Sequence, residues 1–281
     1  MNQTKTEALP QINLNDLTPP CPYSGGILKL KNEWVFADYD MSIQEIRLIY
    51  YVINRFDVSE YFAKDGNFMS SAECDAIHKY GSVENRSILL PLKDMHNAIS
   101  CNSKSKSYSP IVNAAYSLVN KQIKLNNQDK SSEVIDVLKS ASIVKCPDTK
   151  LKCLLLTFSI EFMPFIIGVR GYKKVDINHA FKFESPIAVR YYHWMLHCLK
   201  GKQKNSFPID INTLRNRLAL EGGIKEKHFY KRMIEKPLKE VMNLTDLKVT
   251  VETIVNKQKR GHPLQRVIFK VEKQSVKLSA T

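Results

Sequence analysis

Apolar and polar positions follow the same order twice along the chain. In each copy a short apolar strand is followed by a short helix, a polar turn, a longer amphipathic helix and a closing pair of strands. The first copy has a strand at 87–92, followed by helices at 93–99 and 108–122 around a turn at 100–107. Its closing strands are predicted at 123–125 and 153–160, with a polar excursion between them. The second has a strand at 206–209, helices at 212–219 and 225–243 around Gly222-Gly223, and a hairpin at 247–255 and 264–271.

The closing hairpin of the second copy has a clear strand pattern, because Leu247, Val249 and Val251 alternate with polar residues. Strand, helix, turn, helix and hairpin is the winged-helix form of the helix-turn-helix unit. One copy of this pattern arises often by chance, but two copies offset by 119 residues, from Ser87 to Ser206, are more specific. The sequence therefore predicts an α+β fold with two tandem winged-helix domains.

The segments before the repeat are also readable. Residues 1–25 are rich in Pro, Asn, Gln and Thr, a composition typical of a flexible tail. A strand is predicted at 27–36. A helix is predicted at about 43–56, with Ser42 as its N-cap, because Ile43, Ile46, Ile49 and Ile53 recur every three or four residues.

Nearly all of the excess positive charge lies in the last third of the chain. The net charge is +14, and residues 182–281, with 21 Lys and Arg against 9 Asp and Glu, carry +12 of it. Localised charge on a folded module favours a nucleic acid partner. The alternatives are an anionic membrane surface, which would need a basic amphipathic helix with a broad apolar face, and a merely solvated charged face.

The cysteine pattern and the ends of the chain bear on the compartment. The six cysteines include no CxxC pair, which indicates free thiols in a reducing compartment rather than disulfides or a zinc site. The N-terminus lacks a signal pattern, and the apolar runs are shorter than the roughly 20 residues that span a bilayer. We therefore expect a cytoplasmic protein with no membrane partner.

Two segments of the second copy are candidate DNA contacts. The second helix of a helix-turn-helix enters the major groove by its N-terminal half, which here carries Lys225, Lys227, His228, Lys231 and Arg232. Arg232 can bind a guanine through two hydrogen bonds, whereas the lysines suit phosphates. The alternative is a solvated face with pairs such as Lys231–Glu235.

The tip of the hairpin is the second candidate. Lys257, Lys259 and Arg260 beside Gly261 repel one another unless a polyanion neutralises them, as it does when a wing lies on the DNA backbone. The alternative is a soluble loop.

The first copy has a weaker signal at the equivalent helix start. Its candidates are Lys104, Lys106, Tyr108 and Asn113, of which Asn113 can read adenine. A polar loop with an exposed helix start is an equally good interpretation.

No catalytic, cofactor or metal site is predicted. His193 and His197 lie four residues apart, but the glutamate of an HExxH motif is missing and the surrounding helix is apolar, which favours core or surface histidines. No GxxxxGK[ST] motif supports an ATPase, and no two histidines separated by one residue support a nickase. We expect a protein that is not an enzyme.

From residue 160 to 269 the chain resembles the theta-type plasmid replication initiators, or Rep proteins, which bind origin repeats called iterons. The resemblance is carried by several short motifs in matching order: Glu161-Phe-Met-Pro-Phe, Phe181-x-Phe183, Ala188 with Arg190 and Tyr192, Leu214-Arg215, Tyr230-Lys-Arg232, Thr245-Asp-Leu247, Arg260-Gly261 and Ile268-Phe269. His193-Trp194 and the position of Pro237 depart from the family pattern, and the N-terminal half agrees in pattern more than in letters.

The resemblance implies a non-enzymatic initiator. Such proteins bind double-stranded DNA at direct repeats, help to open an adjacent A+T-rich segment, recruit the host initiator and replicative helicase, and as dimers repress their own gene at an inverted repeat. Two recognition helices about one helical turn apart would cover a site of roughly 20 bp. A two-domain winged-helix transcription regulator is the alternative, because it would use the same residues.

The resemblance also suggests a division of the chain. The segment 181–196 would be the hinge and first helix that support the second winged helix. The predicted parts are a flexible tail at 1–25, a first domain at 26–172 for DNA contact and dimerisation, and the principal basic DNA-binding domain at 173–281.

Overall fold

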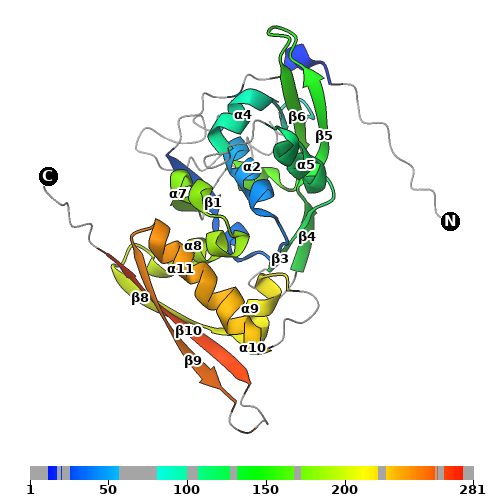
Figure 1. The fold of residues 1–281 in the computed structure, drawn as a ribbon. Coiled ribbons are helices and arrows are strands. Elements are labelled where there is room, and N and C mark those ends of the chain that lie inside the picture. Colours follow the sequence, from blue (N-terminus) through cyan, green and yellow to red (C-terminus); the bar gives the residue numbers. More distant parts are fainter. Residues whose placement is uncertain are drawn as a thin grey trace, which may run out of the picture.

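The computed structural model describes residues 12–17, 20, 26–56, 81–99, 107–126, 132–167, 172–220, 226–256, 258 and 263–274. Two units, each with its own three-stranded sheet, lie at opposite ends of the molecule, with helix α8 (Pro186–Leu199) between them (Figure 1). Within the predicted tail, Leu14–Asp16 forms one 3₁₀ turn, and the remainder lies mostly outside the described residues.

The first unit follows the winged-helix order. Its elements are α2 (Ile43–Ile53), β2 (Ser87–Pro91), α4 (Leu92–Ile99), α5 (Ser109–Leu118), β5 (Leu138–Lys145) and β6 (Lys152–Phe158). Helix α2 begins with the predicted cap: the Ser42 hydroxyl accepts from the Glu45 amide, and the Glu45 carboxylate accepts from the Ser42 amide. The strand order of the sheet is β2-β6-β5.

The second unit repeats this plan. After α8 come β8 (Lys204–Asp210), α9 (Ile211–Arg217), a long helix from Glu226 to Leu244, β9 (Leu247–Val255) and β10 (Leu264–Lys273). The strand order is β8-β10-β9, so in both units the strand before the helix-turn-helix pairs with the last strand of the hairpin. This shared topology confirms the predicted tandem winged helices.

Four sequence predictions of the first unit need correction. The strand at 27–36 ends early: β1 (Ile27–Lys31) is followed by helix α1 (Asn32–Phe36), because a helical turn buries the consecutive residues Trp34 and Val35, whereas a strand would expose one of them. The strand β3 (Gln122–Asn126) pairs with β4 (Ser132–Asp136) and not with the strand at 153–160. The polar excursion contains β4 and β5, and β5 is the partner of β6. The helices predicted at 43–56 and 108–122 end at Ile53 and Leu118.

Strands β4 and β5 escaped detection because they are edge strands. All residues of β4 except Ile135 are exposed, and most of β5 is exposed or half-buried. An edge strand with few buried positions carries a polar sequence that resembles a loop.

The long helix of the second unit is not uniformly α-helical. It consists of α10 (Glu226–Phe229), a π-helical segment (Tyr230–Glu235) and α11 (Lys236–Leu244). The Lys236 amide donates to the Lys231 carbonyl, five residues back. Pro237 follows directly, and a proline offers no amide proton to the preceding turn, so a wider turn fits there. A π-turn holds about one residue more than an α-turn, so Lys231 and Glu235, four residues apart within this segment, are not aligned along one face as they would be in an α-helix.

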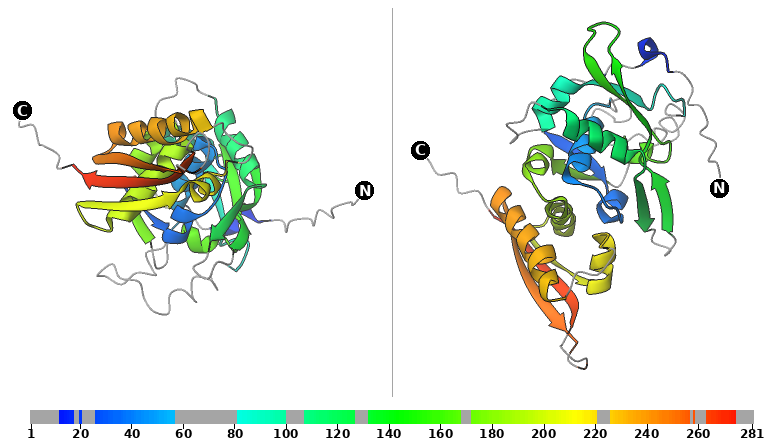
Figure 2. Two further views of the ribbon diagram at one scale, coloured as in Figure 1. Left: turned by 90° about the horizontal axis from the view of Figure 1, so that it is seen from below. Right: turned by 45° about the vertical axis from the view of Figure 1, so that its right-hand side comes forward.

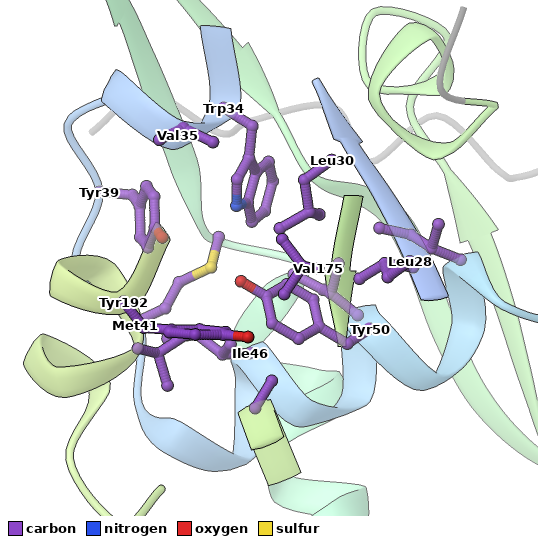
Figure 3. Close-up of a cluster of buried hydrophobic side chains, with 14 of the residues drawn as sticks. Leu28, Leu30, Trp34, Val35, Tyr39, Met41, Ile46, Tyr50, Val175 and Tyr192 are labelled. Atoms are coloured by element: carbon purple, nitrogen blue, oxygen red, sulfur yellow. The ribbon is translucent and has the colours of Figure 1, made fainter. Parts of the chain in front are cut away.

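Helix α8 joins the two units because most of its surface is buried. It contacts α1 and β7 (Tyr172–Asp176) of the first unit and α11, β8 and β10 of the second. Figure 3 shows Tyr192 of α8 among the first-unit side chains Met41, Ile46 and Tyr50. The buried core therefore continues from one unit into the other.

Polar side chains of α8 also bind the backbone of the first unit. The Arg190 guanidinium donates to the carbonyl oxygens of Tyr39, at 2.8 Å, and Ala37, and lies 4.0 Å from the centre of the Tyr39 ring. Trp194 Nε1 donates to the Val35 carbonyl at 2.7 Å. These bonds satisfy carbonyls that would otherwise be buried without a partner, so they fix α8 in one position.

Candidate nucleic-acid interface

The start of the long helix in the second unit exposes a cationic surface. Phe229 and Ile234 are buried, while His228, Lys231 and Arg232 are exposed. The Arg215 guanidinium of α9 lies over the Phe229 ring, 4.1 Å from its centre, and so adds a cation beside this helix. Lys225 lies outside the described residues, and Lys227 is described only as part of α10.

The alternative pairing of Lys231 with Glu235 does not form. Glu235 instead pairs with Lys239 at 2.7 Å, and the hydrogen bond from Lys239 lowers the pKa of the Glu235 carboxyl. Among the described residues, neither Lys231 nor Arg232 forms a salt bridge with a carboxylate, although the nearby Lys231 charge also lowers the pKa of the Glu235 carboxyl. Both cations are therefore exposed and accessible to an external anion, and their contact with DNA stays a prediction.

The β9–β10 hairpin distributes its charge unevenly. Along its strands the cations pair with carboxylates: Arg266 with Asp210 at 3.1 Å, Lys270 with Glu252, and Lys273 with Asp246 at 3.3 Å. At the end nearest the tip, the Asn256 amide donates to the Pro263 carbonyl at 2.9 Å and so joins the two sides of the hairpin. Lys257, Lys259 and Arg260 of the tip lie outside the described residues. The structure thus shows that the charges flanking the tip are largely neutralised.

The corresponding helix of the first unit, α5, presents a neutral surface. No charged residue occurs between Ser109 and Leu118, and Asn113 and Tyr116 are exposed. Tyr108 is half-buried at the start of the helix, with its ring 5.5 Å from that of His96 in an edge-on arrangement. Asn113 is therefore accessible and Tyr108 only partly so. Lys104 and Lys106 lie outside the described residues.

Three exposed or accessible groups beside the candidate site were not among the DNA contacts predicted from the sequence. Tyr230 and Lys236 are exposed on the same helix as Lys231 and Arg232, and Arg215 lies next to Phe229 on α9. The run Tyr230-Lys-Arg232 was visible in the sequence. The position of Arg215 depends on the packing of α9 against the long helix, which no local sequence pattern marks.

The paired histidines have structural positions. His193 is buried, and the Tyr50 hydroxyl lies 3.3 Å from its ring nitrogens. Burial and the nearby Arg190 charge lower the pKa of His193 to about 3, so the ring is neutral at physiological pH. His197 packs edge-on against Phe36. These contacts agree with the prediction of core or surface histidines.

The described residues contain no group of three or more His, Cys, Asp or Glu side chains that could hold a metal ion. In the same part of the chain, Cys146, Cys153 and Cys198 are free thiols. No helix there is long and apolar enough to cross a membrane.

Two family models match the chain. The model described as "Initiator Replication protein, WH1" matches residues 27–196, and "Initiator Rep protein, WH2" matches residues 210–271. A curated replication initiation protein from Escherichia coli is 24% identical over 173 residues, which cover 60% of this chain. The match spans about half of that relative, 51% of its length.

The fold has a counterpart among solved structures. The Pi initiator protein, solved in complex with iteron DNA, has a TM-score of 0.57 and 14% identity over 89% of this chain and 98% of the Pi chain. This degree of likeness shows a shared fold. Domains 2 and 3 of RctB cover 91% of this chain and 94% of theirs at 10% identity, but their TM-score of 0.41 is too low to carry an argument.

Proposed function

Because this chain belongs to the family of plasmid replication initiators with two winged-helix domains, we propose that it binds direct repeats at a replication origin as double-stranded DNA. The observation that carries this proposal is the exposed pair Lys231 and Arg232, which form no salt bridge with a carboxylate among the described residues. They lie on the second helix of a helix-turn-helix, where side chains reach the major groove.

The two units have different roles in this proposal. Residues 173–281 form the principal DNA-binding part, through His228, Lys231 and Arg232 together with Lys225, Lys227 and the tip residues Lys257, Lys259 and Arg260. Residues 26–172 make a weaker contact through the neutral helix α5, with Asn113 as a base reader and Tyr108, Lys104 and Lys106 near its start. They also carry self-association. The strong charge asymmetry between the two parts supports this division.

The later steps of initiation are also part of the proposal. After binding, the protein promotes opening of an adjacent A+T-rich segment and recruits the host initiator and replicative helicase in the cytoplasm. A dimer of the same chain represses its own gene at an inverted repeat. The protein itself carries out no covalent chemistry, so a purified sample should not nick DNA in the presence of magnesium or manganese ions.

Replacing Arg232 with alanine is expected to weaken binding to the origin repeat by on the order of 1–3 kcal/mol and to relax the preference at one base pair. The reason is that a guanidinium can donate two hydrogen bonds to one guanine, and alanine can donate none. Fluorescence anisotropy titrations with the repeat and its single-base variants measure both effects.

The matched control is Arg232→Lys, which keeps the charge but not the two-pronged geometry. It should retain the salt dependence of binding and lose the preference at the same base pair. Equal affinity of the wild type and Arg232→Ala for the repeat would refute the assignment of Arg232.

A further inference from the structure

The β5–β6 hairpin carries a pair of lysines in an unfavourable arrangement. Lys145 and Lys152 are directly opposite each other on the two strands, and both are exposed. Like charges at directly opposed positions destabilise an antiparallel ladder. Neither lysine has a carboxylate partner among the residues that the structure describes. An external anion at this position would relieve the repulsion.

The other hairpin shows how the same fold avoids this situation. On β9–β10, Lys248 is directly opposite Glu272, and Lys270 forms an ion pair with Glu252. No carboxylate lies directly opposite Lys145 or Lys152 on the β5–β6 ladder, where the two lysines face each other. Of the two wings, only the first therefore has directly opposed lysines among the described residues; a further opposed pair, Lys29 and Lys174, lies outside the wings on β1 and β7.

The β5–β6 hairpin is the wing of the first unit. The sheet order β2-β6-β5 matches β8-β10-β9, so β5–β6 is equivalent to β9–β10. Its strand β5 contacts α5, the helix equivalent to the recognition helix of the second unit. The two hairpins project from opposite ends of the molecule in Figure 1 and in the right-hand view of Figure 2.

The first unit needs cations from outside its helix α5. That helix has no charged residue from Ser109 to Leu118, so it cannot neutralise a phosphate with a side-chain charge. Within the wing, Lys150 is already used locally, because its ammonium donates to the Pro147 carbonyl at 2.6 Å. Lys145 and Lys152 are the adjacent lysines without such a bond.

We propose that Lys145 and Lys152 form a second phosphate-binding wing, which holds the backbone of the same duplex beside the bases that α5 faces. This inference rests on the proposed function, because it assigns the first wing to the same DNA. The two wings then contact the duplex at the two ends of the bound segment, and each phosphate contact releases counterions.

The test uses the full-length double variant Lys145→Ala, Lys152→Ala and a duplex that carries the origin repeat. Loss of two phosphate contacts should make the slope of log K against log [salt] less negative by about 1.8. The ratio of wild-type affinity to variant affinity should therefore change about tenfold between 50 and 200 mM salt. Hydroxyl-radical footprinting should show protection lost at one end of the site and kept at the other.

The matched control is the double variant Lys29→Ala, Lys174→Ala. These lysines also face each other directly, on β1 and β7, and β1 lies on the other side of α2 from α5 in Figure 1. This control removes the same number of charges and should leave the slope and the footprint unchanged.

The outcomes separate this inference from the function on which it rests. If the wild type protects no repeat, the proposed function fails. If the wild type protects the repeat and the Lys145→Ala, Lys152→Ala variant has the same slope and footprint, the first wing does not bind phosphate and the function stands. An equal loss of slope in the Lys29→Ala, Lys174→Ala control would also overturn the inference, because the effect would then reflect net charge alone.

Discussion

Replacing Lys257, Lys259 and Arg260 together with alanine is expected to lower the affinity for every duplex by on the order of a hundredfold at about 150 mM salt. The reason is that three phosphate contacts contribute about −2.7 to the slope of log K against log [salt]. Because phosphates carry no base identity, specific and non-specific duplexes should lose affinity by similar factors. Titrations at several salt concentrations, with the repeat and with a scrambled duplex, measure this effect.

The same hairpin offers a matched control. Arg266, Lys270 and Lys273 are three cations on the strands, and each is paired with a carboxylate of the chain. Replacing all three with alanine removes the same charge from groups that are already neutralised locally. Since exposed ion pairs contribute about 0–1 kcal/mol each, the fold should persist. A slope that changes as much in this control as in the tip variant would contradict the assignment of the tip.

Replacing Arg190 with alanine is expected to reduce the free energy of unfolding by about 3 kcal/mol. The buried carbonyls of Ala37 and Tyr39 would lose their donors, and the volume of the guanidinium over the Tyr39 ring would be left empty. Urea denaturation followed by circular dichroism gives the midpoint and the slope of the transition.

Arg190→Lys is the control for the charge of this buried group. Lysine keeps one positive charge but cannot reach two carbonyls with a planar fork, so its stability should lie between those of the wild type and the alanine variant. A loss below about 0.5 kcal/mol for Arg190→Ala, as at an ordinary surface site, would show that α8 is not fixed by this residue.

The second winged helix was predictable because its signals are local. Apolar and polar residues alternate along β9 and β10, and the register of the hairpin agrees with that alternation. On the long helix, the apolar residues Phe229 and Ile234 are both buried. The π-helical segment did not follow, because the effect of Pro237 on the preceding turn depends on how the helix packs against α8.

The first unit was harder to predict because its signals depend on tertiary contacts. Strands β4 and β5 expose most of their residues, so they lack the apolar alternation that marks a strand. The roles of Arg190 and His193 were hidden for the same reason: a charged and a titratable residue are usually exposed, and here both are buried between the two units. The hydrogen-bond partners of Arg190 and His193 lie more than a hundred positions away in the sequence. A local pattern therefore reveals neither the burial of these two residues nor their contacts.

For the candidate site, the structure describes the exposure of some predicted residues but not their contacts with DNA. Exposure of His228, Lys231, Arg232 and Asn113 agrees with their predicted accessibility, whereas their contacts with DNA stay predictions. The cations at the tip of the second wing also stay predictions, because they lie outside the described residues. The opposed lysines of the first wing could not be found from the sequence, because their register requires the pairing of β5 with β6.

We propose that this chain binds tandem repeats as an initiator. Footprinting of the purified protein on the DNA that flanks its own gene tests it most directly. We expect several protected segments of roughly 20 bp, repeated in the same orientation beside an A+T-rich tract. Protection of a single isolated operator without direct repeats would indicate a transcription regulator, and the absence of any sequence-specific protection would contradict the account altogether.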